Sequence, residues 1–224
     1  MSKEFKYRLI TSFLLAISLI LFVLANETLF LFFIFLVLSY SLIEWIKLNY
    51  NYFKKKRFKY NLIILLGFLY AIIVLISAKN LRGTGFDDGF YFIFILSICA
   101  GSDIGGYFFG KIIGGKKLIK RVSPNKTIAG SVGSFIFSII PLVIFNTQSY
   151  FFFNFNFNFK NILLCLFISL FCQVGDLIIS FFKRLNKVKD TGKILPGHGG
   201  LLDRIDGVIF TLPIVYIMEV FNIF

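Results

Sequence analysis

Seven apolar runs, each about as long as a membrane-spanning helix, dominate the sequence. They fall at residues 9–25, 29–46, 61–78, 90–110, 128–146, 161–182 and 207–223. Crossing the ~30 Å hydrocarbon core of a bilayer takes about 20 mostly apolar residues in a helix. Because 58% of all residues are hydrophobic, little polar sequence remains for a soluble domain. The sequence therefore predicts an all-α, polytopic membrane helix bundle with about seven transmembrane helices.

Basic residues are concentrated in alternate loops between these runs. If the N-terminus is inside, all Lys and Arg residues except Lys79, Arg82 and Lys160 lie in cytoplasmic segments. Lys and Arg accumulate in cytoplasmic loops, so this pattern predicts a cytoplasmic N-terminus and an external C-terminus. The same asymmetry accounts for the net charge of +13 without nucleic acid as a partner. Loops of this kind suit anionic lipid headgroups and polyanionic ligands.

The first of two polar segments predicted on the cytoplasmic side spans residues 101–127. Asp103 interrupts an apolar run, and an ionisable residue inside a membrane span is costly enough to indicate a function. Glycines from Gly105 to Gly115 would let backbone N–H groups approach an anion, although the GxxxxGK(S/T) pattern of a P-loop is absent. A lysine-rich loop that only sets topology, with a glycine hinge, is the alternative for this segment.

The motif SPNKT, at residues 123–127, predicts the start of the next helix. Ser123 is the expected cap and Pro124 the first helical residue, because these residue types favour those positions. Lys126 and Thr127 would then lie at a helix N-terminus, where phosphate binds readily. The motif therefore predicts a phosphate-binding site on the cytoplasmic side.

The second polar segment, residues 176–206, contains the only histidine of the chain together with several carboxylates and basic residues. If residues 173–184 are helical, Asp176, Ser180 and Lys183 recur at i, i+4 and i+7 and share one face. The glycines of the following KDTGKILPGHGG predict a loop whose backbone can fold closely around a ligand.

A magnesium site is predicted where this loop meets the last span. Asp203 and Asp206 lie three residues apart in the first turn of that span, facing Asp176 at the end of the preceding one. Mg²⁺ typically takes one or two protein carboxylates and shares its remaining positions with water and substrate phosphates. Three carboxylates in this arrangement would therefore suit a magnesium ion that meets a phosphorylated substrate.

The stretch SFFKRLNKVKDTGKILPGHGGLLDRID resembles the signature of the phosphatidate cytidylyltransferase (CDP-diacylglycerol synthase) family. That signature is S-x-x-K-R, four residues, K-D, then P-G-H-G-G and D-R-x-D, and every position is filled. SDIGGYFFGK and VSPNKT resemble two further elements of the family, in the expected order. The recognisable motifs cover residues 101–130 and 173–207. Ala129 departs from the family pattern, which commonly carries an acid there, and the chain is short for the family by about one span.

The resemblance implies transfer of CMP from CTP to phosphatidate, which gives CDP-diacylglycerol and diphosphate with Mg²⁺ as the cofactor. A second, monovalent cation is left open. The implied metal ligands are Asp176 and Asp203, with Asp206 next, and the implied catalytic residues are Asp176, Asp203, Lys183 and Arg184. Roles in binding substrate or phosphate are implied for Asp103, Ser123, Lys126, Thr127, Ser180, Lys189, Asp190, His198, Gly199, Gly200 and Arg204. His198 would either orient a phosphate or hold the loop.

The predicted organisation is a set of N-terminal membrane helices at residues 1–100 and a catalytic membrane domain with cytoplasmic CTP- and Mg²⁺-binding loops at 101–224. The expected partners are CTP and membrane phosphatidate, the expected location is the bacterial inner (plasma) membrane, and a homodimer is left open. Three alternatives remain: a nucleotidyltransferase that acts on a related lipid phosphate, a CDP-alcohol phosphotransferase suggested by DRIDG, and a non-catalytic protein that binds or transports anionic lipid. The longer D-x-x-D-G-x-x-A-R element of the CDP-alcohol phosphotransferases is absent.

Overall fold

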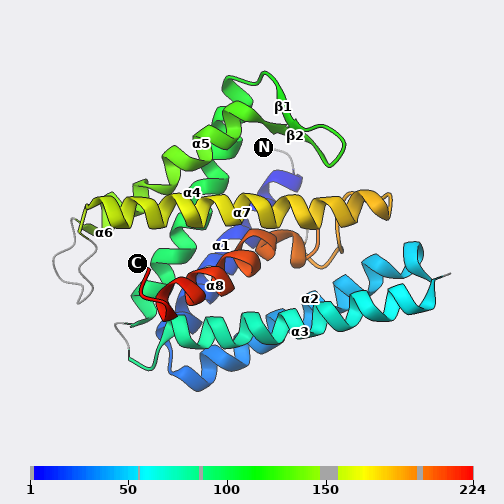
Figure 1. Cartoon of the computed structure of the whole chain (residues 1–224), viewed down its shortest axis with the longest axis horizontal. Coiled ribbons are helices and arrows are strands. Elements are labelled where there is room, and N and C mark those ends of the chain that lie inside the picture. The colour runs from blue at the N-terminus through cyan, green and yellow to red at the C-terminus, as the bar shows by residue number, and fades with distance from the viewer. Residues whose placement is uncertain (1–2, 55, 86–87, 147–155, 196–198, 224) are drawn as a thin grey trace.

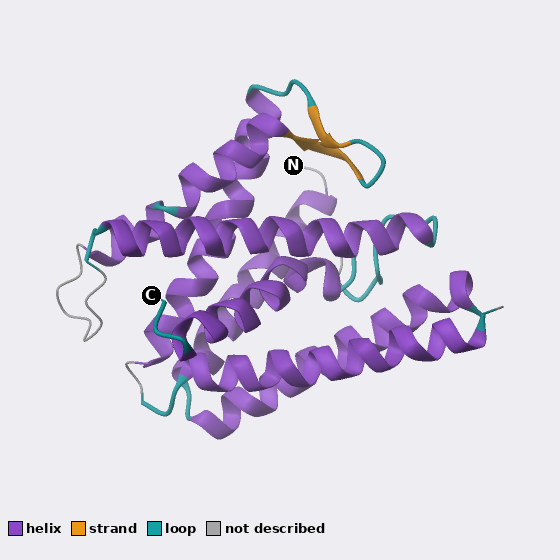
Figure 2. Ribbon diagram, in the orientation of Figure 1, coloured by secondary structure: helices purple, strands orange, loops and turns teal. Residues whose placement is uncertain are grey.

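The computed structural model describes residues 3–54, 56–85, 88–146, 156–195 and 199–223. Helices make up most of this part of the chain, and one short hairpin interrupts them (Figures 1 and 2). The elements in chain order are α1 (Lys3–Leu24), α2 (Glu27–Phe53), α3 (Arg57–Arg82), α4 (Asp88–Ile112), β1 (Lys117–Ile119), β2 (Ser123–Thr127), α5 (Ile128–Ser138), α6 (Ile140–Asn146), α7 (Phe159–Leu185) and α8 (Leu202–Val220).

Each of the seven predicted runs falls on helix, which confirms the all-α membrane bundle. The run at 128–146 is divided into α5 and α6, because Pro141 has no N–H to donate and its ring clashes with the preceding turn. Counting that run once, five helical segments are long and apolar enough to cross a membrane. Among the residues whose side chains are described, α1 contributes a shorter apolar stretch, Phe13–Leu24. Seven spans therefore remain a prediction.

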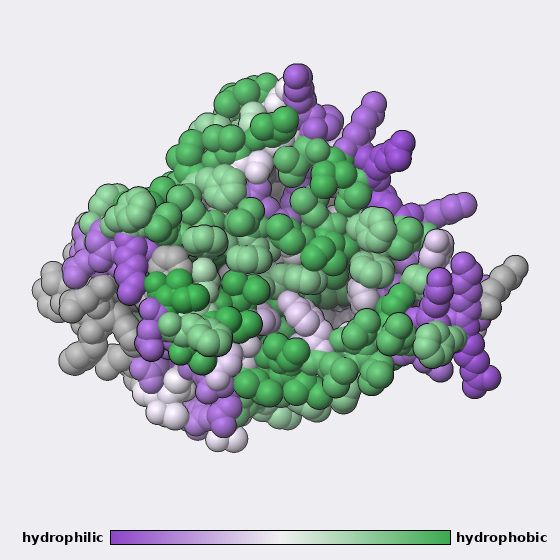
Figure 3. All heavy atoms as spheres, viewed as in Figure 1, coloured by the Kyte–Doolittle hydropathy of each residue, from purple (hydrophilic) through white to green (hydrophobic). Residues whose placement is uncertain are grey.

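The surface of the bundle is apolar around its middle and charged at its ends. Leucine, isoleucine and phenylalanine side chains of α2 and α3 point outward, as lipid-facing residues do. Figure 3 shows hydrophobic side chains across the middle of the visible face. Hydrophilic side chains gather on the right, near the β1–β2 hairpin and the turn between α2 and α3 (Figures 1 and 3). The loops predicted to be cytoplasmic thus lie at one end of the molecule.

Glycines let α4 and α5 pack with their backbones in close contact. A Cβ on Gly133 would lie 2.7 Å from the carbonyl oxygen of Gly105, and one on Gly130 would lie 2.7 Å from that of Gly106. Small residues at such crossings are typical of membrane helices. The prediction of an anion-binding glycine loop is therefore wrong for Gly105, Gly106 and Gly110, since they lie inside α4, where backbone N–H groups belong to the helix.

The motif SPNKT forms strand β2 rather than the first turn of a helix. The strand pairs with β1 in antiparallel register, Lys117 opposite Thr127 and Ile119 opposite Ser123. Helix α5 begins only at Ile128, where the Thr127 hydroxyl accepts a hydrogen bond from the Gly130 N–H at 3.0 Å. The prediction of Ser123 as the helix cap is therefore wrong. Pro124 does not prevent strand formation here, because proline is tolerated on an edge strand. Thr127 does stand at the helix N-terminus, as predicted.

Helices α7 and α8 also meet at glycines, and these flank the predicted carboxylates. A Cβ on Gly175 would lie 2.6 Å from the carbonyl oxygen of Asp206, and Gly207 packs against Cys172. The close crossing brings Asp176, which follows Gly175, near Asp206, which precedes Gly207. The segment between the helices is the predicted loop, in which Gly199 adopts a φ of 91° and pairs with Leu195.

Candidate active site

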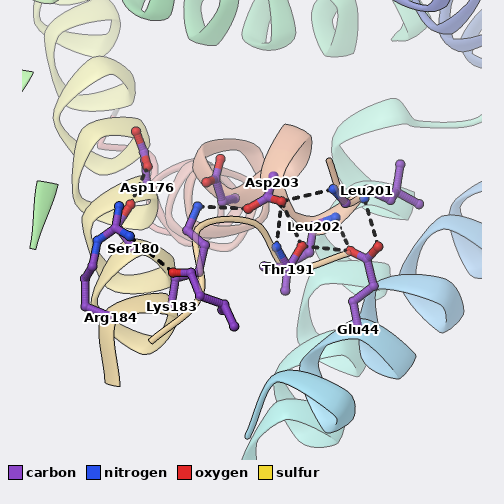
Figure 4. Close-up of polar contacts among 12 residues, drawn as sticks. Glu44, Asp176, Ser180, Lys183, Arg184, Thr191, Leu201, Leu202 and Asp203 are labelled. Atoms are coloured by element: carbon purple, nitrogen blue, oxygen red, sulfur yellow. Dashed lines mark hydrogen bonds and ion pairs between the residues drawn. The ribbon is translucent and has the colours of Figure 1, made fainter. Parts of the chain in front are cut away.

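One face of α7 carries the polar side chains that the helical spacing predicts. Ser180 donates a hydrogen bond to Asp176 Oδ1 at 3.1 Å, and Lys183 lies one turn further on and is largely buried (Figure 4). Ile179 and Phe182 of the same helix line a separate, apolar cavity. The prediction that these three polar residues share a face is confirmed.

Lys183 forms a buried ion pair with Asp203 of α8. Its Nζ lies 2.8 Å from Asp203 Oδ1, and the two side chains are 10% and 6% exposed. The other oxygen, Oδ2, accepts the backbone N–H groups of Thr191 and Gly200 at 2.8 and 3.0 Å. A buried carboxylate is tolerated when it is paired and hydrogen-bonded in this way. Asp203 of α8 therefore contacts both α7 and the loop between the two helices (Figure 4).

A second ion pair links the hairpin to α7. Lys126 Nζ of β2 lies 2.5 Å from Asp176 Oδ2, and both side chains are 29% exposed. Because Asp176 Oδ1 already accepts the Ser180 hydroxyl, both of its oxygens have a partner. The hairpin therefore places one lysine over the same helix face that carries Ser180 and Lys183.

These residues surround a polar cavity of about 600 Å³ between α4, α5, α7, α8 and the hairpin. The aspartates that line it are Asp103, Asp176, Asp190, Asp203 and Asp206. The basic residues that line it are Lys111, Lys126, Lys183 and Arg204. Segments far apart in the sequence thus supply five carboxylates and four cations to one space.

Several other predicted site residues lie outside the lining in the described part of the chain. The Arg184 guanidinium donates to the backbone carbonyls of Val122 and Val188 at 3.1 and 3.2 Å, so it holds the hairpin against the end of α7. Lys189 is exposed. The other predicted site residues outside the cavity lining are Ser123, Ser180, Gly199 and Gly200. The prediction for His198 lies outside the described residues.

Comparison with known proteins identifies the family. The sequence profile of the cytidylyltransferase family matches residues 50–221, which is most of the chain. The chain belongs to the cytidylyltransferase family. The match begins within α2 and includes every residue that lines the polar cavity.

The curated relatives support the same grouping. The chain is 37% identical over 143 residues to the phosphatidate cytidylyltransferase of Bacillus subtilis, covering 64% of this chain and 51% of the relative. It is 41% and 43% identical over 129 residues to the phosphatidate cytidylyltransferases of Staphylococcus saprophyticus and Staphylococcus aureus, covering 57% of this chain and 48% of each relative. The chain therefore spans about half the length of the curated relatives it matches.

The predicted magnesium ligands line the cavity but do not form a ready-made cluster. Within the described residues, no group of three His, Cys, Asp or Glu side chains is placed to hold a metal ion. Asp203 already accepts Lys183 and two backbone N–H groups, whereas Asp206 is bonded through Oδ1 to the adjacent Gly207 N–H at 2.9 Å. This donor set fits Mg²⁺, which needs only one or two protein carboxylates when phosphates supply other positions.

Sequence reasoning missed Glu44, which lies in α2 and contacts the loop that carries the site. Its carboxylate accepts the N–H groups of Leu201 and Leu202 at 3.2 and 2.8 Å and the Thr191 hydroxyl at 3.0 Å. The signal was present in the sequence, because Glu44 interrupts an apolar run just as Asp103 does. The rule that selected Asp103 would have selected Glu44 as well.

Proposed function

We propose that the chain transfers CMP from CTP to phosphatidate and releases CDP-diacylglycerol and diphosphate. The observation that carries the proposal is the convergence of Asp176, Lys183 and Asp203 on one polar cavity, in a chain of the cytidylyltransferase family. The names of the relatives supply the substrate pair. The aspartates are proposed to serve the metal, the basic residues the phosphates, and the membrane bundle the lipid.

The chemistry requires two anions to meet. A phosphate oxygen of phosphatidate attacks the α-phosphorus of CTP, a new P–O bond forms, and the bond from the α-phosphorus to the diphosphate breaks. No general base is needed, because the second pKa of a phosphate monoester is about 6 and the oxygen is already ionised near neutral pH. Lys126, Lys183 and Arg204 line the cavity, which supports our assigning them the role of offsetting the repulsion between the phosphates.

The charge of the cavity supports a metal ion in the reaction. With every group ionised, the four cations and five carboxylates that line the cavity leave it with one formal negative charge. A polyphosphate entering such a space needs further positive charge. We propose that Mg²⁺ takes its protein ligands from Asp176, Asp203 and Asp206, which all line the cavity. When bound, the ion would neutralise phosphate charge in the transition state. A second, monovalent cation and a homodimer stay predictions.

The proposed location is the plasma membrane, with the N-terminus and the cavity on the cytoplasmic side. The basic loops at one end of the bundle support this orientation. A cysteine introduced by Leu118→Cys or Lys187→Cys should react with an impermeant maleimide only from the cytoplasmic side, and one introduced by Asn156→Cys only from outside. The three native cysteines are buried, which keeps the background low. Reaction at position 187 from outside would contradict the proposed orientation, because cytoplasmic CTP could then not reach the cavity.

Incorporation of labelled CTP into lipid tests the proposed function directly. The purified chain in vesicles with phosphatidate, radiolabelled CTP and Mg²⁺ should give label that extracts into organic solvent. EDTA should abolish the signal, and added Mg²⁺ should restore it. Vesicles without phosphatidate, or with an ether-linked lipid phosphate, separate this substrate from the related ones. Absence of lipid-soluble label under all of these conditions would support the non-catalytic alternative.

A further inference from the structure

Glu44 is a buried carboxylate inside a membrane helix, and within the described residues its hydrogen-bond partners lie in the loop at the active site and at the start of α8. The residue is 2% exposed. Within the described part of the chain Glu44 forms no ion pair, so the N–H groups of Leu201 and Leu202 and the Thr191 hydroxyl compensate its charge. Burying a carboxylate is costly unless it is well hydrogen-bonded. The loop therefore satisfies Glu44, and Glu44 in turn fixes the loop (Figure 4).

Glu44 and Asp203 bind the same loop from opposite sides. The Thr191 hydroxyl lies 3.0 Å from Glu44 Oε2 and 3.1 Å from Asp203 Oδ2. A hydroxyl has one proton to donate, so it can serve only one of these carboxylates at a time. Gly200 allows the close fit, since a Cβ there would lie 2.6 Å from Glu44 Oε2. The position of Asp203 therefore depends on a residue that does not itself line the cavity.

The residue after Glu44 joins the same helix to α7. The Trp45 indole donates to the carbonyl of Ile63 in α3 at 3.2 Å, and its ring packs edge-on against Phe182 at 4.7 Å. Phe182 precedes Lys183, the partner of Asp203. Helix α2 thus contacts both the helix that carries Lys183 and the loop that orients Asp203.

We propose that Glu44 is a positioning residue of the reaction. It holds Thr191, Leu201 and Leu202 so that the neighbouring Asp203 and its partner Lys183 keep their places in the cavity. The inference rests on the function proposed above and extends its site to α2. That helix lies outside the predicted catalytic domain at 101–224, and Glu44 lies outside the residues that match the family profile.

The first test compares two identical substitutions on one helix. Glu44→Gln keeps the size of the side chain, but an amide cannot accept both backbone N–H groups and the hydroxyl as a carboxylate does. Glu27→Gln is the matched control, because Glu27 lies at the other end of α2 in a partly exposed pair with Lys79 at 3.5 Å. We expect kcat to fall about tenfold for Glu44→Gln, since small displacements of reacting groups are costly. KM for both substrates should change by less than about threefold.

The second readout does not depend on activity. Hydrogen–deuterium exchange of peptides covering 190–202 should be about tenfold faster in Glu44→Gln, or ~1.4 kcal/mol of lost protection. Exchange in α4 and α5 should stay as in wild type. Thr191→Val removes the shared hydroxyl while keeping the N–H that binds Asp203. Combining it with Glu44→Gln should add less than the sum of the two effects, because the Thr191 hydroxyl is one of the groups that Glu44 binds.

The outcomes separate the inference from the function on which it rests. If the wild-type protein does not incorporate CTP into lipid, the proposed function is wrong. The exchange experiment would still decide whether Glu44 fixes the loop. If wild type is active and Glu44→Gln matches Glu27→Gln in kcat and in loop exchange, Glu44 has no positioning role. A rise in KM at unchanged kcat would also overturn it. Faster exchange throughout the bundle would mean that Glu44 only stabilises the fold.

Discussion

The two polar segments predicted on the cytoplasmic side, residues 101–127 and 176–206, differ in how much of their chemistry reaches the cavity. In the second segment, Asp176 and Lys183 share the helix face that their spacing predicts, and both line the cavity together with Asp203. In the first, most glycines pack α4 against α5, and most lysines lie exposed on or near the hairpin. Charges spaced at the helical period near the end of an apolar span are thus more informative than charges clustered in a loop, because a helix fixes direction and a loop does not.

The largest expected effect comes from the second segment. Asp176→Asn keeps the shape of the side chain and removes the charge that Lys126 and the proposed Mg²⁺ would share. We expect CTP incorporation to fall by about 10³-fold or more, because electrostatic stabilisation of phosphoryl transfer is worth several kcal/mol. Protein level and membrane insertion should be unchanged. A loss below about tenfold would show that Asp176 is peripheral and would remove the contrast between the segments.

Lys126 belongs to the first segment, but its substitution should lower activity strongly, as substitutions in the second segment do. It lines the cavity and pairs with Asp176 at 2.5 Å. Lys126→Gln should lower kcat/KM for CTP by about 10²-fold, the usual cost of removing one preorganised electrostatic contact. Lys120→Gln, on the exposed end of the same hairpin, is the matched control. Equal losses in the two variants would mean that total hairpin charge matters and the Lys126–Asp176 contact does not.

Substitution of Arg184 should lower activity less than the catalytic role implied by the family motif would predict. Its guanidinium is bound to the backbone carbonyls of Val122 and Val188, so it joins the two segments without lining the cavity. Arg184→Gln should reduce kcat about fivefold, in line with the net worth of an intramolecular hydrogen bond. Arg184→Lys should rescue little, because a lysine cannot reproduce the two-carbonyl fork. A loss as large as that of Asp176→Asn would restore the catalytic role implied by the family motif.

The smallest effect is expected on the exposed face of the hairpin. Lys117, Lys120 and Arg121 are exposed and do not line the cavity in the described part of the chain. Replacing all three by Gln should raise KM for CTP less than about threefold, and the difference should vanish at high salt because exposed charges are screened. A loss of kcat that persists in high salt would place these residues at the reaction.

Particular residues show what the sequence could predict. The face shared by Asp176, Ser180 and Lys183 was predictable, because the helical period alone sets it. The seven helical runs followed from the length of apolar sequence that a bilayer demands. The hairpin was missed, since SPNKT fits a helix start and an edge strand equally well. The contact between Glu44 and Leu202 joins residues 158 positions apart, and no local pattern encodes such a pairing.

The central claim is that the carboxylates of α7 and α8 act as one site, and a double-mutant cycle on Asp176 and Asp203 tests it most directly. Incorporation of labelled CTP into lipid would be measured for Asp176→Asn, Asp203→Asn and the double variant under identical conditions. Residues that act as one unit are strongly non-additive, so the double variant should be within about threefold of the worse single variant. If the two losses multiply, or if both single variants keep near-normal incorporation, the aspartates do not form one catalytic site.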